Sequence, residues 1–127
     1  MRSFLIAAAS VLVITPTWAQ FVDALKIAES ADAIVYIEPG TLLKDGDLRR
    51  IWILYDQKVH PTTGGDSARI YQEFDCKERR TRVLSFISYS GHMAKGEVIS
   101  KEKQQGDWED VAPQTADESG LGWVCAR

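Results

Sequence analysis

Two histidines and two closely spaced carboxylates are the groups that could carry acid–base chemistry in this chain of 127 residues. His60 stands in a segment rich in Pro and Gly, and His92 follows Gly91, so both are expected in exposed loops. Neither has a sequence neighbour of the kind that a general base or a metal ligand needs. Glu73 and Asp75 share one strand face, where they could act as a pair, but solvated charges opposite basic neighbours are the expected arrangement.

The established catalytic signatures are missing from the sequence. It contains no Gly-x-Ser-x-Gly, no His-Glu-x-x-His, no phosphate-binding glycine loop and no Cys-x-x-Cys. We therefore predict no catalytic residue, no metal site and no cofactor. A small hydrolase with an unrecognised site is the weakest alternative, and it would need a cleft that joins a histidine to an acidic or nucleophilic side chain.

The densest cluster of charge spans residues 77–82, which we place in a hairpin between two strands. Its four cations are Lys77, Arg79, Arg80 and Arg82. They could bind a polyanionic partner, such as a glycosaminoglycan, the acidic surface of a matrix protein or envelope lipopolysaccharide. The alternative is a solubilising turn whose charges pair with nearby carboxylates.

The two tryptophans nearest the end of the chain are open to two interpretations. Trp108 and Trp123 could form an aromatic patch for a partner. Large aromatic side chains near a terminal helix are more often part of the core, and we expect that arrangement here.

The first nineteen residues have the pattern of a secretory signal peptide. Arg2 provides a positive charge, Phe4–Ile14 is mostly apolar, and Thr17 and Ala19 are small residues suited to a cleavage site. The apolar run is too short to span a bilayer, which takes about twenty residues. No cysteine follows the cleavage site, so no lipid anchor is expected.

We accordingly predict a signal peptide at residues 1–19 and a single exported domain at residues 20–127, in the periplasm or outside the cell. Loss of Arg2 leaves 14 basic and 18 acidic residues, a net charge of −4. This balance is too mild to favour nucleic acid, and it gives no general attraction to an anionic membrane.

Two cysteines in an exported protein favour a disulfide. The alternative is a pair of unrelated buried thiols. Metal binding is disfavoured because neither Cys76 nor Cys125 has a cysteine or histidine at ligand spacing.

Turn signals at short intervals divide the rest of the chain into segments rich in Ile, Val, Leu, Tyr and Trp, which is typical of an antiparallel sheet. Asp45-Gly46 is the strongest hairpin signal, because a tight two-residue turn needs positive φ. We predict strands at Phe21–Ala28, Ala33–Ile37, Leu48–Asp56, Ala68–Cys76, Thr81–Tyr89 and Gly96–Lys101, with a short one at Trp108–Val111.

Side-chain alternation indicates which faces of these strands are covered. In residues 68–76 the apolar residues share one parity with Cys76, which should therefore face the interior. Residues 48–56 and 81–89 are apolar on both parities, as in strands that are covered on both faces. Either the curvature of the sheet or a packed helix has to provide the second cover.

The C-terminal tail could supply that helix. Thr115 and Glu118 form a capping-box pattern, and Leu121, Val124 and Cys125 recur at helical spacing. About ten residues that include two glycines would not stay helical alone, so the helix must be held by docking.

Several segments together resemble the surface-adhesin protein E family of small exported bacterial proteins. They are residues 34–40, 45–46, 52–56, 70–76, 80–89, 96–98, Trp108, Pro113 and residues 123–125. The resemblance implies an α+β fold, in which one curved antiparallel sheet of about six strands receives a short C-terminal helix on its concave face. It also implies that a disulfide between Cys76 and Cys125 ties this helix to the sheet.

For function, the resemblance implies attachment to host matrix glycoproteins such as vitronectin and laminin. The family's namesake is lipid-anchored, whereas this chain lacks the acceptor cysteine, so a periplasmic or secreted protein is expected. The alternative is a structural or accessory protein of the cell envelope without a host ligand. An unpaired edge strand could support dimerisation.

Overall fold

The computed structural model describes residues 10–12 and 23–127, so most of the predicted signal peptide lies outside the described residues. No helix in these ranges has the length and apolar character needed to cross a bilayer. The elements in chain order are β1 (Leu25–Glu29), β2 (Ala33–Ile37), the 3-10 helix η1 (Pro39–Thr41), β3 (Leu43–Asp45), β4 (Leu48–Gln57), β5 (Ser67–Asp75), β6 (Arg80–Tyr89), β7 (Val98–Glu102), β8 (Glu109–Asp110) and α1 (Ala116–Cys125).

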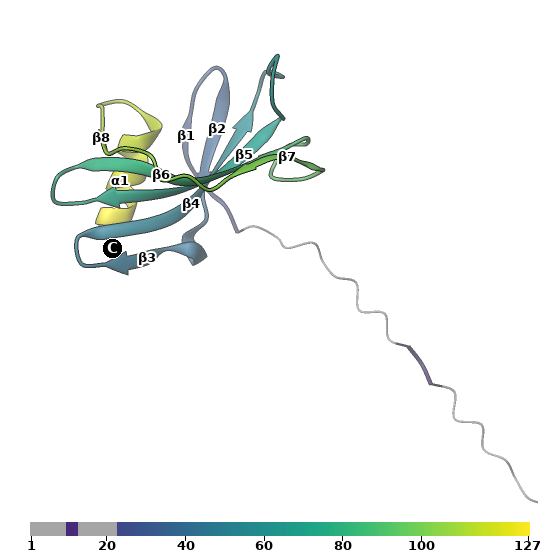
Figure 1. The fold of residues 1–127 in the computed structure, drawn as a ribbon, viewed down its shortest axis with the longest axis horizontal. Helices are drawn as coiled ribbons and strands as arrows, with labels where there is room; N and C mark the ends of the chain where they lie inside the picture. Colours follow the sequence, from purple (N-terminus) through teal and green to yellow (C-terminus); the bar gives the residue numbers. More distant parts are fainter. Residues whose placement is uncertain (1–9, 13–22) are drawn as a thin grey trace, which may run out of the picture.

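The strands form one antiparallel sheet in the order β1-β2-β4-β5-β6-β7 (Figure 1). The central strand β4 pairs with β5 over residues 48–56. Its other edge is shared, because β2 pairs with residues 53–57 and the short β3 with residues 48–50. Strand β8 similarly occupies the start of β6, where β7 does not reach. The fold is α+β, as predicted.

The order and approximate bounds of the predicted strands are confirmed. The Asp45-Gly46 turn is also confirmed, and Gly46 has the expected positive φ of 57°. Strand β3 was not predicted, because its three exposed residues show no alternation. The first strand begins at Leu25, and residues 21 and 22 of its predicted range lie outside the described part of the chain.

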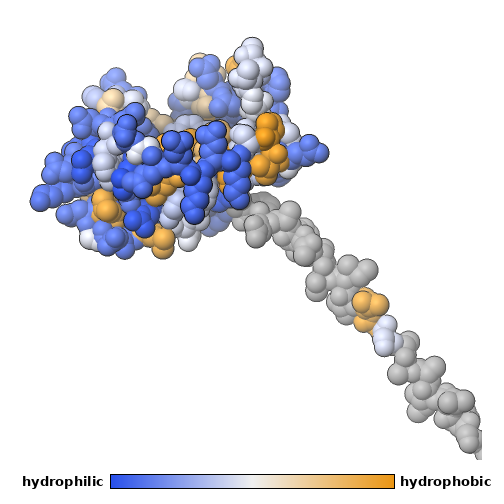
Figure 2. Space-filling model, viewed as in Figure 1, coloured by the Kyte–Doolittle hydropathy of each residue, from blue (hydrophilic) through white to orange (hydrophobic). Residues whose placement is uncertain are grey.

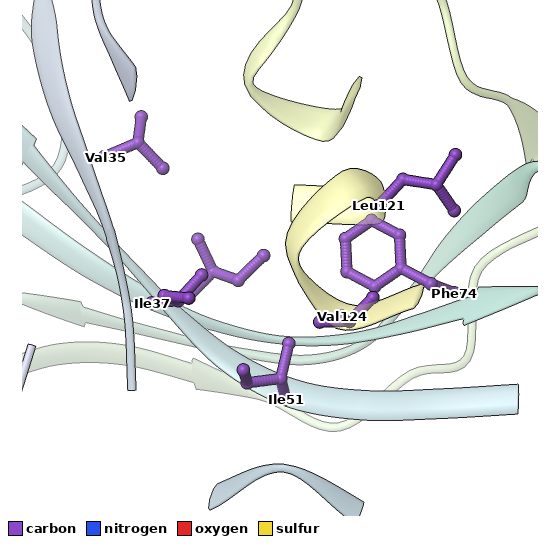
Figure 3. Packing of buried hydrophobic residues seen from close by; sticks show 7 residues of the cluster. Val35, Ile37, Ile51, Phe74, Leu121 and Val124 are labelled. Carbon is purple, nitrogen blue, oxygen red and sulfur yellow. The ribbon is translucent and has the colours of Figure 1, made fainter. Parts of the chain in front are cut away.

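The hydrophobic core lies between α1 and the concave side of the sheet (Figure 3). Its members come from β2, β4, β5 and the helix, and each is at most 5 % exposed: Val35, Ile37, Ile51, Ile53, Phe74, Leu121 and Val124. Burial of one such side chain contributes roughly 1.5 to 3 kcal/mol. The spacing of Leu121 and Val124 therefore correctly predicts the helical face that docks.

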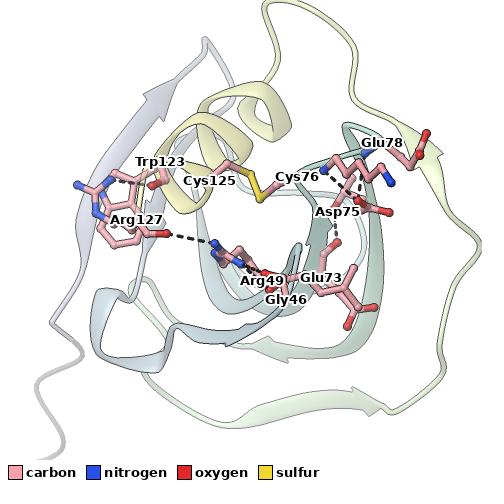
Figure 4. Close-up of a disulfide and its surroundings, with 12 residues drawn as sticks. Gly46, Arg49, Glu73, Asp75, Cys76, Glu78, Trp123, Cys125 and Arg127 are labelled. Carbon is pink, nitrogen blue, oxygen red and sulfur yellow. Dashed lines mark hydrogen bonds between the residues drawn. A yellow bond between two sulfur atoms is a disulfide. The ribbon is translucent and has the colours of Figure 1, made fainter.

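A disulfide between Cys76 and Cys125 joins the last turn of α1 to the end of β5 (Figure 4). At the other end of the helix, Thr115 Oγ1 accepts a hydrogen bond from the backbone N–H of Glu118. The Glu118 carboxylate accepts one from the backbone N–H of Gln114. The helix is thus capped at its start, as the sequence predicts, and covalently fixed at its end.

Two glycines inside α1 differ in what surrounds them. A Cβ added at Gly120 would lie 2.9 Å from Cζ of the buried Phe74 ring, so this glycine permits the close approach of helix and sheet. A Cβ added at Gly122 would have no other atom within 4 Å.

This difference gives a matched pair of substitutions. Gly122→Ala should raise the free energy of unfolding by about 1 kcal/mol, because alanine is the better helix former and meets no obstacle. Gly120→Ala should lower it, because the same gain in helix propensity is opposed by the contact with Phe74. Urea unfolding of both variants measures the two effects, and equal stabilisation by both would contradict the packing described here.

Candidate functional site

The sheet face opposite α1, here called the outer face, is covered mainly by polar and aromatic side chains of the sheet itself. Its charged and aromatic members alternate with the core residues: Arg50, Trp52, Arg69, Tyr71, Glu73, Asp75, Arg80 and Arg82. On the side of the molecule seen in Figure 2, hydrophilic residues predominate and hydrophobic residues form small separate patches. The outer side of these strands is therefore covered by side chains of the sheet itself and not by a second helix.

In one half of the outer face, an arginine stacks on aromatic rings. The guanidinium of Arg69 lies 4.5 Å from the centroid of the Trp52 ring, which stacks on Tyr71 at 5.0 Å. Glu38 accepts two hydrogen bonds of 2.8 Å from Arg69, through Nε and Nη2. This bidentate pairing fixes the plane of the guanidinium, so the cation–π contact is held in one geometry.

The centre of the outer face holds a carboxylate that is completely buried. Glu73 is 0 % exposed and accepts hydrogen bonds from Arg50 Nε at 2.6 Å and Arg82 Nε at 2.8 Å. Burial by itself would raise the pKa of Glu73, but these hydrogen bonds outweigh it and hold the pKa below its ordinary value of 4.5. Glu73 therefore remains ionised and immobilises both arginines.

The other half of the outer face is built around Trp108. Two guanidinium groups lie over its ring, that of Arg80 at 4.6 Å and that of Arg82 at 4.2 Å from the centroid. Arg80 also donates to Asp75. The pKa of Asp75 is lowered chiefly by the hydrogen bond from the backbone N–H of Glu78 and then by the one from Arg80. Asp75 thus holds both the Arg80 side chain and the turn between β5 and β6 in place.

The predicted basic cluster is in this hairpin, but the structure divides it into two pairs. Arg80 and Arg82 are half-buried and held by Trp108 and the carboxylates. Lys77 and Arg79 are exposed at the turn and form no ion pair within the described ranges. A role for these four residues in ligand binding remains a prediction.

Two expectations about the outer face are wrong. Glu73 and Asp75 have the predicted basic neighbours, but they are buried rather than solvated, because arginine side chains close over them. Trp108 contacts Arg80 and Arg82 on the outer face and is not part of the core. Trp123 does pack against the core, and Arg127 lies 3.7 Å from its ring centroid (Figure 4).

The histidines are exposed as predicted, but the expectation that neither has a suitable neighbour is wrong. His60 Nδ1 lies 2.5 Å from Asp66 Oδ1, and His92 Nδ1 lies 3.1 Å from Asp56 Oδ1. His92 Nε2 is also 3.8 Å from Asp66 Oδ2, so one carboxylate lies between the two rings. Neither ring hydrogen-bonds to a hydroxyl or thiol in the part of the chain that is described.

These histidines connect two loops at one end of the sheet. The loop of residues 91–96 is further held by Asp56, which accepts from the backbone N–H of Met93, and by Ser67, which accepts from that of Ala94. Since Asp56 is 37 residues from Met93, local sequence carries no signal for this contact. Within residues 23–127, no group of three or more histidine, cysteine or carboxylate side chains is arranged to hold a metal ion.

The surface of the described chain has recesses, two of which are large enough for a small molecule. The larger, of about 680 Å³, lies between the start of α1 and strands β1 and β2, and its charged lining residues are the acids Glu29 and Glu118. Burial raises the pKa of Tyr55, which also lines it, to about 12. The smaller recess, of about 390 Å³, is on the outer face and is lined by Arg50, Arg82 and Lys103 among others. Of these two recesses, the smaller one has the cations that suit an anion.

The family model of surface-adhesin protein E matches residues 24–126, almost all of the described domain. The chain belongs to this family. The resemblance noted in the sequence is thereby confirmed. A comparison with curated proteins gives no match.

Solved structures with a similar fold include several of Haemophilus influenzae protein E. One crystal form has 14 % sequence identity and a TM-score of 0.59, with 81 % of this chain and 97 % of that chain covered. A second structure of the protein has 15 % identity and a TM-score of 0.57, covering 81 % and 93 %. A third, from a non-typeable strain, has 16 % identity and a TM-score of 0.54, covering 82 % and 84 %. At such identities the likeness establishes the fold alone.

The buried carboxylate predicts a specific dependence of stability on pH. Glu73→Gln should lower the free energy of unfolding at pH 7 by about 2 kcal/mol, less than the roughly 3 to 5 kcal/mol of a fully buried pair, because both arginines reach solvent. Since the folded pKa of Glu73 lies below 4.5, its contribution is complete above that pH and is lost as the pH falls through the folded pKa. The difference between the variant and the parent should therefore shrink below about pH 4.

Urea unfolding at several pH values measures this difference. Glu78→Gln is the matched control, because Glu78 is an exposed carboxylate in the same hairpin, and it should change stability by less than about 0.5 kcal/mol. A Glu73→Gln difference that stays constant from neutral to acid pH would show that the charge of Glu73 does not stabilise the fold.

Proposed function

We propose that this chain is an exported, non-enzymatic binding protein of the bacterial envelope, which attaches to host matrix glycoproteins through the hairpin between β5 and β6. Membership of the surface-adhesin protein E family supports this role. The signal-peptide pattern of residues 1–19 supports export to a space where such partners can be met.

The observation that carries the proposal is the construction of the hairpin. The guanidinium groups of Arg80 and Arg82 both lie over the Trp108 ring, and Asp75 orders the turn. Lys77 and Arg79 project from this ordered base into solvent. A rigid base with exposed cations at its tip loses little conformational freedom when an acidic protein surface or polyanionic glycan binds.

The chemistry of the outer face also supports a binding function over an enzymatic one. Its carboxylates are ionised and saturated by arginines, so they are poor proton acceptors. The histidine pair is at the far end of the sheet from the hairpin, and neither ring hydrogen-bonds to a hydroxyl or thiol in the described chain. We therefore assign the hairpin to recognition rather than to chemistry.

Charge reversal at the hairpin tests the proposal. The Lys77→Glu, Arg79→Glu double variant should bind immobilised vitronectin or laminin at least about tenfold more weakly at physiological salt, equivalent to about 1.4 kcal/mol. Most of the loss should be in the association rate and should shrink as salt is raised, because exposed charges act chiefly by steering.

The matched control is Lys44→Glu, Lys95→Glu, which makes the same change in net charge at exposed positions on β3 and in the 91–96 loop. It should retain binding within about twofold. Equal losses in the two double variants would show that net charge alone is recognised. If the parent binds no matrix protein, the proposal is wrong and an envelope accessory protein is favoured.

A further inference from the structure

The smaller recess lies on the outer face between β4, β5, β6 and the segment that follows β7. Its volume of about 390 Å³ falls within the roughly 300 to 1,000 Å³ of small-molecule sites. Tyr71 and Glu73 line it from β5, with Arg50 and Arg82 on the neighbouring strands, and Lys103 and Gln105 complete it from the segment after β7. Gly106 fastens that segment, because its N–H donates to the carbonyl of Val83 at 2.8 Å.

A β-bulge in β6 brings together the side chains of this recess. Arg82 pairs with Glu73 and Ser85 with Tyr71, so that Leu84 is an extra residue opposite β5. In a regular strand, residues three apart point to opposite faces, whereas here Arg82 and Ser85 both face outward. The bulge is thus the feature that places a hydroxyl beside the cations.

The lining carries an excess of positive charge with unused hydrogen-bond donors. Arg50, Arg82 and Lys103 share the lining with a single carboxylate, Glu73, so its cations exceed its anions by two. Arg50 uses only Nε, leaving both terminal nitrogens without a partner in the described chain. Arg82 gives Nε and Nη2 to Glu73, and Gln105 accepts from Nη1 when its amide oxygen faces the arginine. That orientation directs the Gln105 NH₂ group away from Arg82 and makes it available.

Three cations that approach from three different elements match a group with several outward oxygens. A sulfate or phosphate ester has such tetrahedral geometry, whereas a planar carboxylate is better matched by one arginine fork. The recess is larger than the ion itself, and Ser85, Gln105 and Tyr71 offer hydroxyl and amide groups to a hydroxyl-rich carrier.

We propose that this recess binds a sugar that carries a sulfate or phosphate ester, with the ester held by Arg50, Arg82 and Lys103. Glu73 is the positioning residue that holds the two arginines apart and oriented. The site is separate from the exposed hairpin tip at Lys77 and Arg79. It therefore adds a ligand class to the proposed matrix attachment, and the two can fail independently.

Titrations of the ¹⁵N-labelled, disulfide-bonded protein test the proposal with three probes: N-acetylglucosamine 6-sulfate, N-acetylglucosamine 6-phosphate and unsubstituted N-acetylglucosamine. Saturable shifts are expected for amides of residues 82–85 and 103–105 with the two esters, but not with the neutral sugar. Tighter binding of the sulfate would indicate a sulfated extracellular glycan, and tighter binding of the phosphate a phosphorylated envelope glycan.

Lys103→Ala should weaken ester binding about tenfold, the loss expected for one charged hydrogen bond. Lys101→Ala removes the same charge from an exposed position on β7, and its affinity should stay within about twofold. Both lysines are exposed, so melting temperatures close to that of the parent are expected. Arg50→Lys keeps the charge but removes the fork, and it should also weaken binding.

Several results would overturn the site. They are equal losses in Lys101→Ala and Lys103→Ala, equal affinity for the neutral sugar, and shifts confined to the hairpin tip. Loss of matrix-protein binding in the Lys77, Arg79 double variant with ester binding intact would separate the two sites. Matrix binding without any saturable ester binding would leave the proposed function standing and remove this inference.

Discussion

The covalent attachment of one short helix is the constraint on which the rest of the structure depends. Helix α1 has ten residues, two of them glycine, and could not persist alone in water. Its cap at Thr115, the buried Leu121 and Val124, and the Cys76–Cys125 bond together hold it on the concave face. Helix α1 is the only α-helix of the described chain, so no second α-helix is available for the outer side.

The outer face is therefore stabilised by alternating guanidinium groups, aromatic rings and carboxylates. Arg69 hydrogen-bonds to Glu38 and lies over the Trp52 ring. Glu73 accepts hydrogen bonds from Arg50 and Arg82, and Arg82 also lies over the Trp108 ring. Such a surface excludes water from its carboxylates while it keeps arginine edges exposed. The arginines that stabilise the outer face thus include Arg50 and Arg82, which line the proposed anion site.

Local sequence accounts for the strands, the Asp45-Gly46 turn and the capped helix, because alternation, positive φ and capping act over a few residues. The disulfide could be predicted because the chain has two cysteines and a signal-peptide pattern that predicts export. The environment of Glu73 was not predictable, because Arg50 is 23 residues away and reaches it only through the register of β4 and β5. The recess depends on the bulge at Leu84, and the histidine cluster on two loops that meet at one end of the sheet.

Equilibrium unfolding of Cys125→Ser beside the parent protein tests the central constraint most directly. The disulfide closes a loop across a separation of 49 residues, which the chain-entropy model values at roughly 4 kcal/mol. We expect the variant to lose about that much stability and α1 to exchange its amide protons much faster. A variant that melts within about one or two degrees of the parent, with α1 still protected, would show that docking does not depend on the covalent bond.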